Sequence, residues 1–536
     1  MKKSFVKYLS VVLIVSVSSF AAVTWQPAAD ATSWDTTSAW SSGAVPVANE
    51  IVEITSAYSC ELNSASAALK ELNMGNGSTA VLNVNSGGTL NMGGGGYINV
   101  GRRGHSEINV YEGGSMVLTS GARINMSWTA DSIINQYGGT VKPSVLLSVG
   151  PNSTYNISGG TLDISDGDNT AVKLGNNNPL ADAEMNISGT GEVVVSGNCY
   201  FWAGVDSRSP SGGTVNQSGG YLNLSTCNKE LLLGADAGTS GIYNLSAGDV
   251  DVNTHLIIGS NGYGEFNQSG GVADISGYVL VGKYVGSSGI MTVSGGTFNT
   301  TGGAMYVGNN DVGELEISGG TFNCTDSLRL GRFEDAQGYL TISGGSVNIG
   351  GYLQASDPIA GATDPNQHAE ITVLGSAADN ITIGGRLDLR DKESTKLNFR
   401  FDEGGITPIS CGDHAPIEGT EITFAEVEDS ALVIGQQFDA IVTAPGFTIV
   451  TDATNIFVDE SDVYDFSYEI VALSEGGEAL RFTVTDISYP DCASAVAAGV
   501  TLPADFNLDC VVDLADFAEM AANWMVCNDP SGTNCQ

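Results

Sequence analysis

Basic residues are scarce in this sequence. Its 536 residues include 20 Lys and Arg but 60 Asp and Glu, which gives a net charge of −40. Nucleic acids and anionic lipids are bound through clustered Lys and Arg, so this balance argues against both as partners. It is compatible with divalent cations and neutral glycans. Histidine is also rare, with four residues that lie far apart in the sequence, so no zinc pattern or Ser-His-Asp triad can be argued.

Long apolar runs are absent beyond the N-terminus. The chain starts with Lys2, Lys3 and Lys7, followed by an apolar stretch over 9–17 and the small residues of Ser19-Phe20-Ala21. This order predicts a secretory signal over 1–21 and a bacterial protein that is exported to the cell surface or medium. The alternative is an N-terminal membrane anchor, but the apolar stretch is too short for a stable span.

Glycine is abundant, with 70 residues, and much of it recurs in a fixed phrase. A Gly-Gly or degenerate step recurs in eleven copies that are 21 to 30 residues apart, after Ser86, Glu112, Tyr137, Ser158, Ser188, Ser218, Ser246, Ser269, Ser294, Ser318 and Ser343. An apolar residue followed by Gly, as in Val281-Gly282, trails this step by 13 to 17 positions. Two linked positions kept over so many copies indicate a structural repeat.

The residues around each glycine step alternate between apolar and polar, as at Leu315, Ile317 and Phe322. A period of two predicts short strands with one buried face, and the Gly pair allows a tight corner. One coil cannot bury its inward face alone, but stacked coils make a continuous core. The pattern therefore predicts an all-β solenoid. Propeller blades need roughly 40 or more residues per repeat, so a propeller is excluded.

The tandem SGGT strands and the Leu/Val-Gly steps over about 70–355 resemble the glycine-rich repeats of autotransporter-like secreted proteins. The resemblance implies a right-handed parallel β-helix, which we assign to 61–356. It says little about activity, because this fold serves adhesins, surface-layer proteins and polysaccharide lyases alike.

The segments on either side of the repeats are predicted to cover the two ends of the solenoid. Trp25, Trp34 and Trp40 lie within 22–60, which we predict is an N-terminal cap, the alternative being a Trp-lined carbohydrate platform. In 357–488 the repeat stops, and strand candidates lie at 396–401, 421–427, 438–442, 468–473 and 480–484. We predict antiparallel β-structure there, as a small sandwich or as irregular final coils.

Two further patterns recur within the repeats, one of Asn and one of Cys residues. Asn residues precede the repeat Ser by two positions at Asn156, Asn186, Asn216, Asn244 and Asn267. These form glycosylation sequons, but their repeat spacing favours a stacked polar column on one face. Cys199 and Cys227 occupy equivalent places in adjacent coils, which leaves open an inter-coil disulfide or buried thiols.

The tail, 489–536, contains the motif with the most definite chemistry. The sequence from Ala504 to Trp524, ADFNLDCVVDLADFAEMAANW, spaces its oxygen ligands as a calcium loop does. Ca²⁺ takes six to eight oxygens, here predicted from side chains at loop positions 1, 3, 5, 9 and 12 and from the carbonyl at position 7. The predicted ligands are Asp505, Asn507, Asp509, Asp513 and Asp516, with the backbone carbonyl of Val511. A helix follows, with one apolar face. The alternative is an acidic surface turn with a helix cap.

This segment resembles the dockerin calcium-binding repeat, and the resemblance implies Ca²⁺-dependent docking to a cohesin-like or cell-surface protein. The sequence departs from the dockerin pattern at two points. Position 6, usually Gly, is Cys510, a candidate to form a disulfide with Cys527 just past the helix. Only one loop is recognisable where dockerins carry two, although a short helix over 492–498 could replace the missing half.

Candidate catalytic residues are sparse. Charged residues in the turns after the second glycine step could line one ridge: Asp206, Asp236, Lys283, Asp311, Arg332 and Asp335. They are spread one per coil, without the paired carboxylates of a glycosidase or a compact acidic cluster beside a base. We therefore predict a non-catalytic secreted scaffold that displays, binds or adheres. The alternative is a polysaccharide lyase or glycoside hydrolase on the β-helix.

Overall fold

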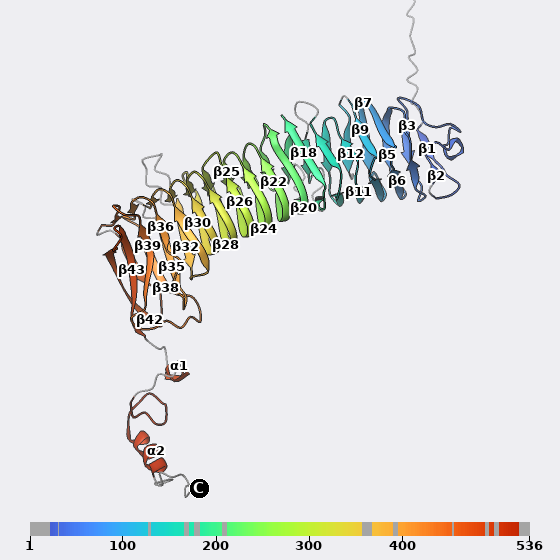
Figure 1. The fold of residues 1–536 in the computed structure, drawn as a ribbon. Helices are drawn as coiled ribbons and strands as arrows, with labels where there is room; N and C mark the ends of the chain where they lie inside the picture. Colours follow the sequence, from blue (N-terminus) through green and yellow to red (C-terminus); the bar gives the residue numbers. More distant parts are fainter. Residues whose placement is uncertain are drawn as a thin grey trace, which may run out of the picture. The chain divides into compact units, whose positions relative to one another are not determined.

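The protein is an all-β parallel β-solenoid of about 14 turns, as the sequence predicts. The computed structural model describes residues 22–524 except 31, 120, 127–129, 166–170, 176–182, 206–211, 356–366, 390–394, 453–454, 488–491 and 498–502. The predicted signal segment 1–21, Asp206 and Cys527 lie outside the described residues. The chain divides into two compact units, residues 1–200 and 201–536, which run from blue to blue-green and from green to red in Figure 1.

The first unit is built from parallel strands. From β8 to β17 each strand pairs with the strand three places further along the chain, as in β8–β11, β9–β12 and β10–β13, which makes three strands to a coil in this part of the first unit. Its elements are β1 (Val23–Trp25), β2 (Thr32–Ser33), η1 (Thr37–Ala39), β3 (Ile51–Ile54), β4 (Cys60–Leu62), β5 (Leu69–Met74), β6 (Ala80–Val84), β7 (Thr89–Val100), β8 (Ser106–Val110), β9 (Ser115–Leu118), β10 (Arg123–Met126), β11 (Ser132–Gln136), β12 (Thr140–Lys142), β13 (Leu146–Val149), β14 (Ser153–Ile157), β15 (Thr161–Ile164), β16 (Ala171–Leu174), β17 (Ala183–Ile187) and β18 (Glu192–Gly197).

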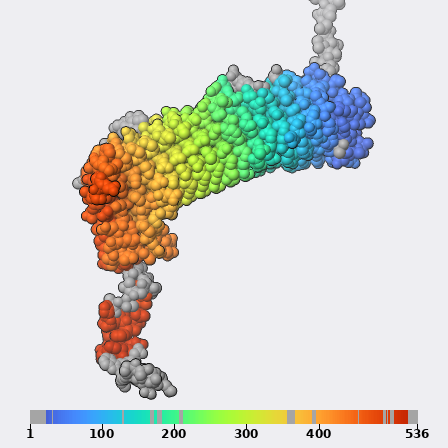
Figure 2. All heavy atoms as spheres, in the orientation of Figure 1, coloured from blue at the N-terminus to red at the C-terminus, as the bar shows by residue number. Residues whose placement is uncertain are grey.

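The second unit alternates one long strand with one short strand in each coil from β20 to β31, and each pairs with its counterpart in the next coil. After β19 (Tyr200–Ala203), its coils contain β20 (Gly212–Cys227), β21 (Leu231–Leu233), β22 (Ser240–Val252), β23 (Leu256–Ile258), β24 (Tyr263–Ile275), β25 (Val279–Val281), β26 (Ser288–Thr300), β27 (Met305–Val307), β28 (Val312–Cys324), β29 (Leu328–Leu330), β30 (Gln337–Ile349), β31 (Leu353–Ala355), β32 (His368–Leu374), β33 (Ala378–Ile383), β34 (Leu387–Asp388), β35 (Thr395–Phe401), β36 (Ile409–Cys411), β37 (Ala415–Pro416), β38 (Glu421–Glu426), β39 (Gln437–Thr443), β40 (Ile449–Val450) and β41 (Ile456–Asp459). The neighbouring coils close-pack into a continuous surface on the face shown in Figure 2.

In the second unit the Ser-Gly-Gly step is a bend within one strand, whereas in the first unit the step lies in a turn between two strands, as the sequence predicts, for example at Gly113-Gly114 between β8 and β9. In the long strands β24 and β26 the parallel register runs up to the step, shifts there and resumes beyond it. The second glycine, Gly296, has a φ of +75°, and a Cβ atom on it would lie 2.4 Å from the carbonyl oxygen of Gly271 in the preceding coil. Only glycine combines that φ with such a close approach of two backbones.

The inward side chains of successive coils stack on one another along the core. Tyr243, Phe266, Phe298 and Phe322 are fully or almost fully buried, and their ring centroids are 5.5, 6.0 and 5.6 Å apart in that order. Over these four coils one aromatic ring per coil therefore lies among the aliphatic side chains of the core, and each ring packs on those of the neighbouring coils.

The predicted asparagine column is confirmed within each unit. In the first unit the Nδ2 of Asn156 donates to Asn135 at 2.8 Å and that of Asn186 donates to Asn156 at 2.9 Å. In the second, Asn244 donates to Asn216 at 2.9 Å and Asn267 to Asn244 at 3.0 Å. The amides thus bond to each other along the axis, as in stacked β-structures. Cys199 and Cys227 are buried as thiols, and no disulfide joins them.

The three N-terminal Trp rings are buried against one another in the first coils. Trp25 and Trp34 are each 1 % exposed and Trp40 is 3 % exposed. Trp40 meets both of the other rings edge to face, at 4.7 and 4.8 Å between centroids, a favourable aromatic geometry. Rings this buried offer no carbohydrate platform, so that alternative is wrong.

The prediction of antiparallel structure over 357–488 is largely wrong. Parallel coils continue through β35, β38 and β41. Antiparallel pairing between the named strands is confined to β42 (Tyr464–Ala472) and β43 (Glu478–Ile487), where β43 pairs with β42 on one side and β39 on the other. The region is therefore a set of irregular final coils closed by a hairpin rather than a sandwich.

Two helices lie in the tail, α1 (Cys492–Ala497) and α2 (Leu514–Trp524). The sequence predicts both, α1 as a short helix over 492–498 and α2 from the apolar spacing after the loop. The Oδ1 atom of Asp513, which is predicted as a calcium ligand, accepts a hydrogen bond from the Ala515 N–H at 2.7 Å and so caps α2. Among the described residues no helix is both long and apolar enough to cross a membrane.

Candidate functional site

The strongest candidate site is the acidic loop between α1 and α2. Asp505, Asp509 and Asp516 each bring a carboxylate oxygen to within 4.8 Å of those of the other two. They are the only such group of three Asp, Glu, His or Cys residues in the part of the chain that the structure describes. Three carboxylates at this separation could hold a metal ion, because each could supply one oxygen to a common centre.

Backbone amides of the loop orient two of these carboxylates. The Asp505 carboxylate accepts from the N–H groups of Asp509, at 3.2 Å, and Cys510, at 2.8 Å. The Asp516 carboxylate accepts from Phe506 at 2.7 Å and from Asp513 at 2.8 Å. These bonds fold the chain around its acidic residues, and Asp505 and Asp516 are only 6 % and 2 % exposed.

The hydrogen bonds also favour the charged form of Asp516. Its pKa is lowered, first by the N–H of Asp513 and then by those of Asn507 and Phe506, against the opposing effect of desolvation. A carboxyl that accepts several amide hydrogen bonds is stabilised as the anion. Asp516 is therefore held in the state that binds a cation.

The other predicted ligands border this cluster. The Asn507 Nδ2 donates to the Asp509 carboxylate at 2.7 Å, so these two side chains lie together. Asp513 caps α2, as described above. Val511 N–H donates to Asp509 at 3.0 Å, while the role of the Val511 carbonyl as a ligand stays a prediction.

The tail disulfide differs from the one predicted. Cys510 is bonded to Cys492 at the start of α1, with Cα atoms 5.5 Å apart, and so it does not pair with Cys527. Cys510 occupies the loop position usually taken by glycine and has a φ of +62°. The crosslink fixes a left-handed residue that the loop needs and joins the loop to α1.

Apolar side chains surround the loop and face solvent. The most exposed are Leu514 and Phe517, at 84 % and 61 %. The others are Phe506, Leu508, Val511 and Val512, which are 45–56 % exposed. Of the apolar face predicted for α2, Phe517 is thus exposed, and Met520 and Ala521 are half-buried. Such a group of exposed apolar residues is a feature of interaction surfaces.

The predicted charged ridge on the coils does not form a catalytic cluster in the described residues. Lys283 lies over its neighbour Tyr284, and Arg332 lies over Tyr306 and Phe333. Asp311 accepts from the N–H groups of Gly286 at 2.6 Å and Val312 at 2.9 Å. Asp236 and Asp335 join no three-residue acidic group of the kind found in the tail. The side chains of Lys283, Arg332 and Asp311 thus make contacts with local turns and rings.

A shallow groove lies beside this ridge. Its volume is about 510 Å³, and its lining is mostly small residues of successive turns, namely Gly238, Thr239, Ser240, Gly262, Tyr263, Gly286, Ser287, Ser288, Asp311 and Val312. Asp311 is the only acidic residue in this lining and there is no basic residue. The groove therefore lacks the pair of groups that acid–base chemistry on a sugar would need.

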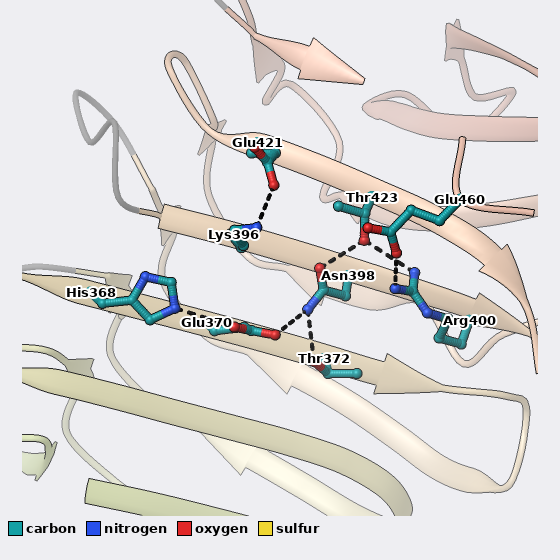
Figure 3. A network of polar contacts seen from close by, with 9 residues as sticks. All are labelled: His368, Glu370, Thr372, Lys396, Asn398, Arg400, Glu421, Thr423 and Glu460. Atoms are coloured by element: carbon teal, nitrogen blue, oxygen red, sulfur yellow. Dashed lines mark hydrogen bonds and ion pairs between the residues drawn. The ribbon is translucent and has the colours of Figure 1, made fainter. Parts of the chain in front are cut away.

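A denser polar network lies on the outer face of β32, β35 and β38 (Figure 3). Lys396 bonds Glu421 at 2.7 Å, Arg400 bonds Glu460, and Asn398 bonds Glu370 at 2.7 Å. Each cation in it faces a carboxylate from a neighbouring strand or loop. Opposite charges directly across strands stabilise a sheet, so this network supports the final coils.

Sequence reasoning missed two aspects of the site. The partner of Cys510 lies upstream at Cys492, and cysteine connectivity cannot be deduced from spacing alone. The exposure of Leu514 and Phe517 depends on what packs against α2, which the helical pattern does not reveal.

Two comparisons with known proteins identify no relative of this chain. A scan against protein-family models finds no match, and a search of curated proteins finds none either.

Proposed function

We propose that this protein is a secreted, non-catalytic scaffold whose β-solenoid presents a binding surface and whose tail docks to a partner protein when Ca²⁺ is bound. The observation that carries the proposal is the acidic loop. Its three carboxylates converge, and exposed apolar side chains such as Leu514 and Phe517 lie beside it. A cation that orders the loop would also fix the arrangement of these apolar residues.

Calcium suits this loop better than other common cations. The converging groups are all carboxylate oxygens, and hard oxygen ligands favour Ca²⁺ or Mg²⁺ over softer metals. The loop supplies these oxygens from within one short segment, and Ca²⁺ tolerates the irregular geometry of such a loop better than Mg²⁺ does. The partner that fits best is a cohesin-like or other cell-surface protein, and export through the N-terminal signal segment would place the chain outside the cell.

Calcium binding is tested by isothermal titration of the full chain. We expect one saturable Ca²⁺ site per chain, lost in the D505N/D516N variant and kept in E519Q. Glu519 is an exposed acid of α2 outside the cluster, so E519Q controls for the loss of negative charge alone. Absence of saturable binding, or equal loss in E519Q, would refute the calcium site.

Docking is tested separately with cohesin-like modules immobilised on a surface. We expect binding of the full chain in Ca²⁺, its loss in a chelator and its weakening at least tenfold in the L514D/F517D variant. That variant keeps every loop carboxylate. Undiminished binding by this variant would show that the exposed apolar residues are not the docking surface.

A further inference from the structure

The strand edges at the two ends of the solenoid differ in how they are covered. At the N-terminal end a returning segment bonds to the outer edge of β1. The N–H of Ser41 donates to Thr24 at 2.9 Å, and that of Gln26 donates to Ala39 at 2.6 Å. At the C-terminal end the last two strands in the described part of the chain are each paired on one side only, β41 with β38 and β42 with β43. An unpaired edge of this kind can accept a strand from another chain.

The unpaired edge of β42 presents backbone groups in a regular order. The N–H of Phe466 donates to the Asp459 carboxylate at 3.2 Å, so it points away from β43. From Phe466 to the end of the strand the antiparallel register with β43 has no shift, and the backbone groups of successive residues point to alternate sides. Those of Tyr468 and Ile470 therefore also point away from β43. An extended segment could bond to them and add a strand to the sheet.

The inward row of β42 is exposed where that of β43 is buried. Tyr468 and Ile470 pair with Phe482 and Leu480 of β43. Phe482 and Leu480 are 0 % exposed, whereas Tyr468 is 48 % and Ile470 39 % exposed. The Tyr468 ring also stacks on Phe457 of β41, at 3.9 Å between centroids. The row of core side chains thus continues onto a strand that no further coil covers among the described residues, and it offers an apolar surface beside the open edge.

The other face of this edge and the turn before it are acidic. Asp465 and Glu469 alternate with the apolar row of β42. Asp459, Glu460 and Asp462 lie at the end of β41 and in the turn after it. All five are exposed, and residues 456–472 contain no Lys or Arg.

The cations on the neighbouring strands leave this negative charge largely uncompensated. Each of them already pairs with a carboxylate, namely Lys396 with Glu421, Arg400 with Glu460 (Figure 3) and Arg481 with Asp439. Arg481 also lies across from Glu469 in the register. The five exposed acids together with Glu421 and Asp439 still outnumber these three cations. A negative edge favours a basic strand as its partner.

We propose that the unpaired edge of β42 docks an extended, basic segment of a partner protein, which adds a strand to the end of the solenoid. Its backbone would bond to Tyr468 and Ile470, and its apolar side chains would pack beside theirs. Its basic side chains would face Asp465 and Glu469. A second copy of the chain fits less well, because two β42 strands side by side would bring like charges together. The inference rests on the binding role proposed for the solenoid and does not depend on the calcium loop.

The test measures binding of the full chain to a synthetic peptide of the length of β42 in which Lys and Val alternate. We expect saturable binding by calorimetry that weakens as salt rises. One control peptide has its Lys and Val in separate blocks, and a second has methylated backbone nitrogens, which cannot donate to the edge. Both should bind at least tenfold more weakly. Equal binding of either control, or no binding of the alternating peptide, would overturn the proposal.

Hydrogen exchange and variants locate the surface. The alternating peptide should slow exchange at the amides of Tyr468 and Ile470. Y468K/I470K should lower its affinity at least tenfold. The control Y111K/Y137K adds the same charge to an exposed tyrosine pair of the first unit and should bind normally. Unaltered exchange at the two amides, loss of binding in the control, or unchanged binding in Y468K/I470K would refute the assignment.

Two further outcomes would assign the edge to a different occupant. A dimer in sedimentation that Y468K/I470K dissociates would assign it to a second copy of the chain. A higher affinity for the peptide in L514D/F517D would assign it to the chain's own tail. Either result would overturn the proposal. D505N/D516N should bind the peptide normally, which separates this result from the calcium site.

Discussion

Single glycine residues decide whether neighbouring coils can approach each other. Gly296 and Gly286 both have left-handed backbones, with φ of +75° and +87°. A Cβ on Gly296 would lie 2.4 Å from the carbonyl oxygen of Gly271, whereas nothing lies within 4 Å of one on Gly286. Alanine at Gly286 therefore tests the left-handed backbone conformation alone, whereas alanine at Gly296 tests that conformation together with the close contact between coils.

We predict that G286A costs about 1–2 kcal/mol of stability, the penalty of a left-handed alanine. G296A should cost more than about 3 kcal/mol, because the facing backbone must also move. Urea unfolding of both variants checks this. Equal midpoints for the two would mean that the close contact between coils contributes nothing.

Asp516 gives a second prediction at this scale. Amide hydrogen bonds lower its pKa in the folded chain, so its contribution to stability is present above the unfolded pKa of about 3.9 and is lost as pH falls through the lower folded value. We expect the side-chain carboxyl carbon of Asp516 to titrate below pH 3.9 in an NMR experiment without Ca²⁺. Titration at or above that pH would contradict the hydrogen-bonded loop.

At the scale of the elements, the tail loop has a disulfide-bonded cysteine at the position where such loops usually have glycine. Cys510 has a φ of +62° and is bonded to Cys492. Without the disulfide, Cys510 could relax out of the left-handed region, and Ca²⁺ would have to restore the loop conformation on binding. Glycine adopts that conformation at little cost.

We therefore predict that C492A weakens Ca²⁺ binding about tenfold, which corresponds to about 1.4 kcal/mol. C492A/C510G should regain most of that loss, although it also lacks the disulfide. Calorimetric titration of the two variants is the measurement. If C492A/C510G binds Ca²⁺ as weakly as C492A does, the disulfide does not act by preserving the left-handed conformation of residue 510.

Sequence patterns at this scale predict that strands exist better than they predict how strands pair. The alternation in β35 and β38 is the same for parallel and antiparallel neighbours, so the parallel pairing of Leu397 with Ile422 could not be foreseen. Likewise the apolar positions continue on both sides of Gly295-Gly296, which hides the fact that one strand runs through the bend.

At the scale of the whole molecule, the solenoid could be predicted because the same pattern of residues repeats from coil to coil. The apolar positions of the core and the asparagine column recur with the glycine steps, and the structure places them as expected. The contacts of Tyr306 with Tyr278 and Arg329 could not be predicted. These three residues come from different coils and become neighbours only once the register is known.

The tail was predicted in part for a similar reason. A calcium loop draws its ligands from one short stretch of sequence at fixed spacing, so Asp505, Asp509 and Asp516 can be recognised from the sequence, and the structure brings them together. The bond from Cys510 to Cys492 joins two elements whose mutual arrangement no spacing rule specifies.

The central claim is that the chain separates two tasks, with a solenoid that holds its shape without calcium and a tail loop that is ordered by it. Hydrogen exchange of the full chain with and without Ca²⁺ tests this most directly. We predict that Ca²⁺ slows exchange at the amides of Phe506, Cys510 and Asp513, which bond to Asp505 and Asp516, and leaves the strands β20 to β30 unchanged. Exchange in the loop that Ca²⁺ does not alter, or protection that spreads through the coils, would contradict the account.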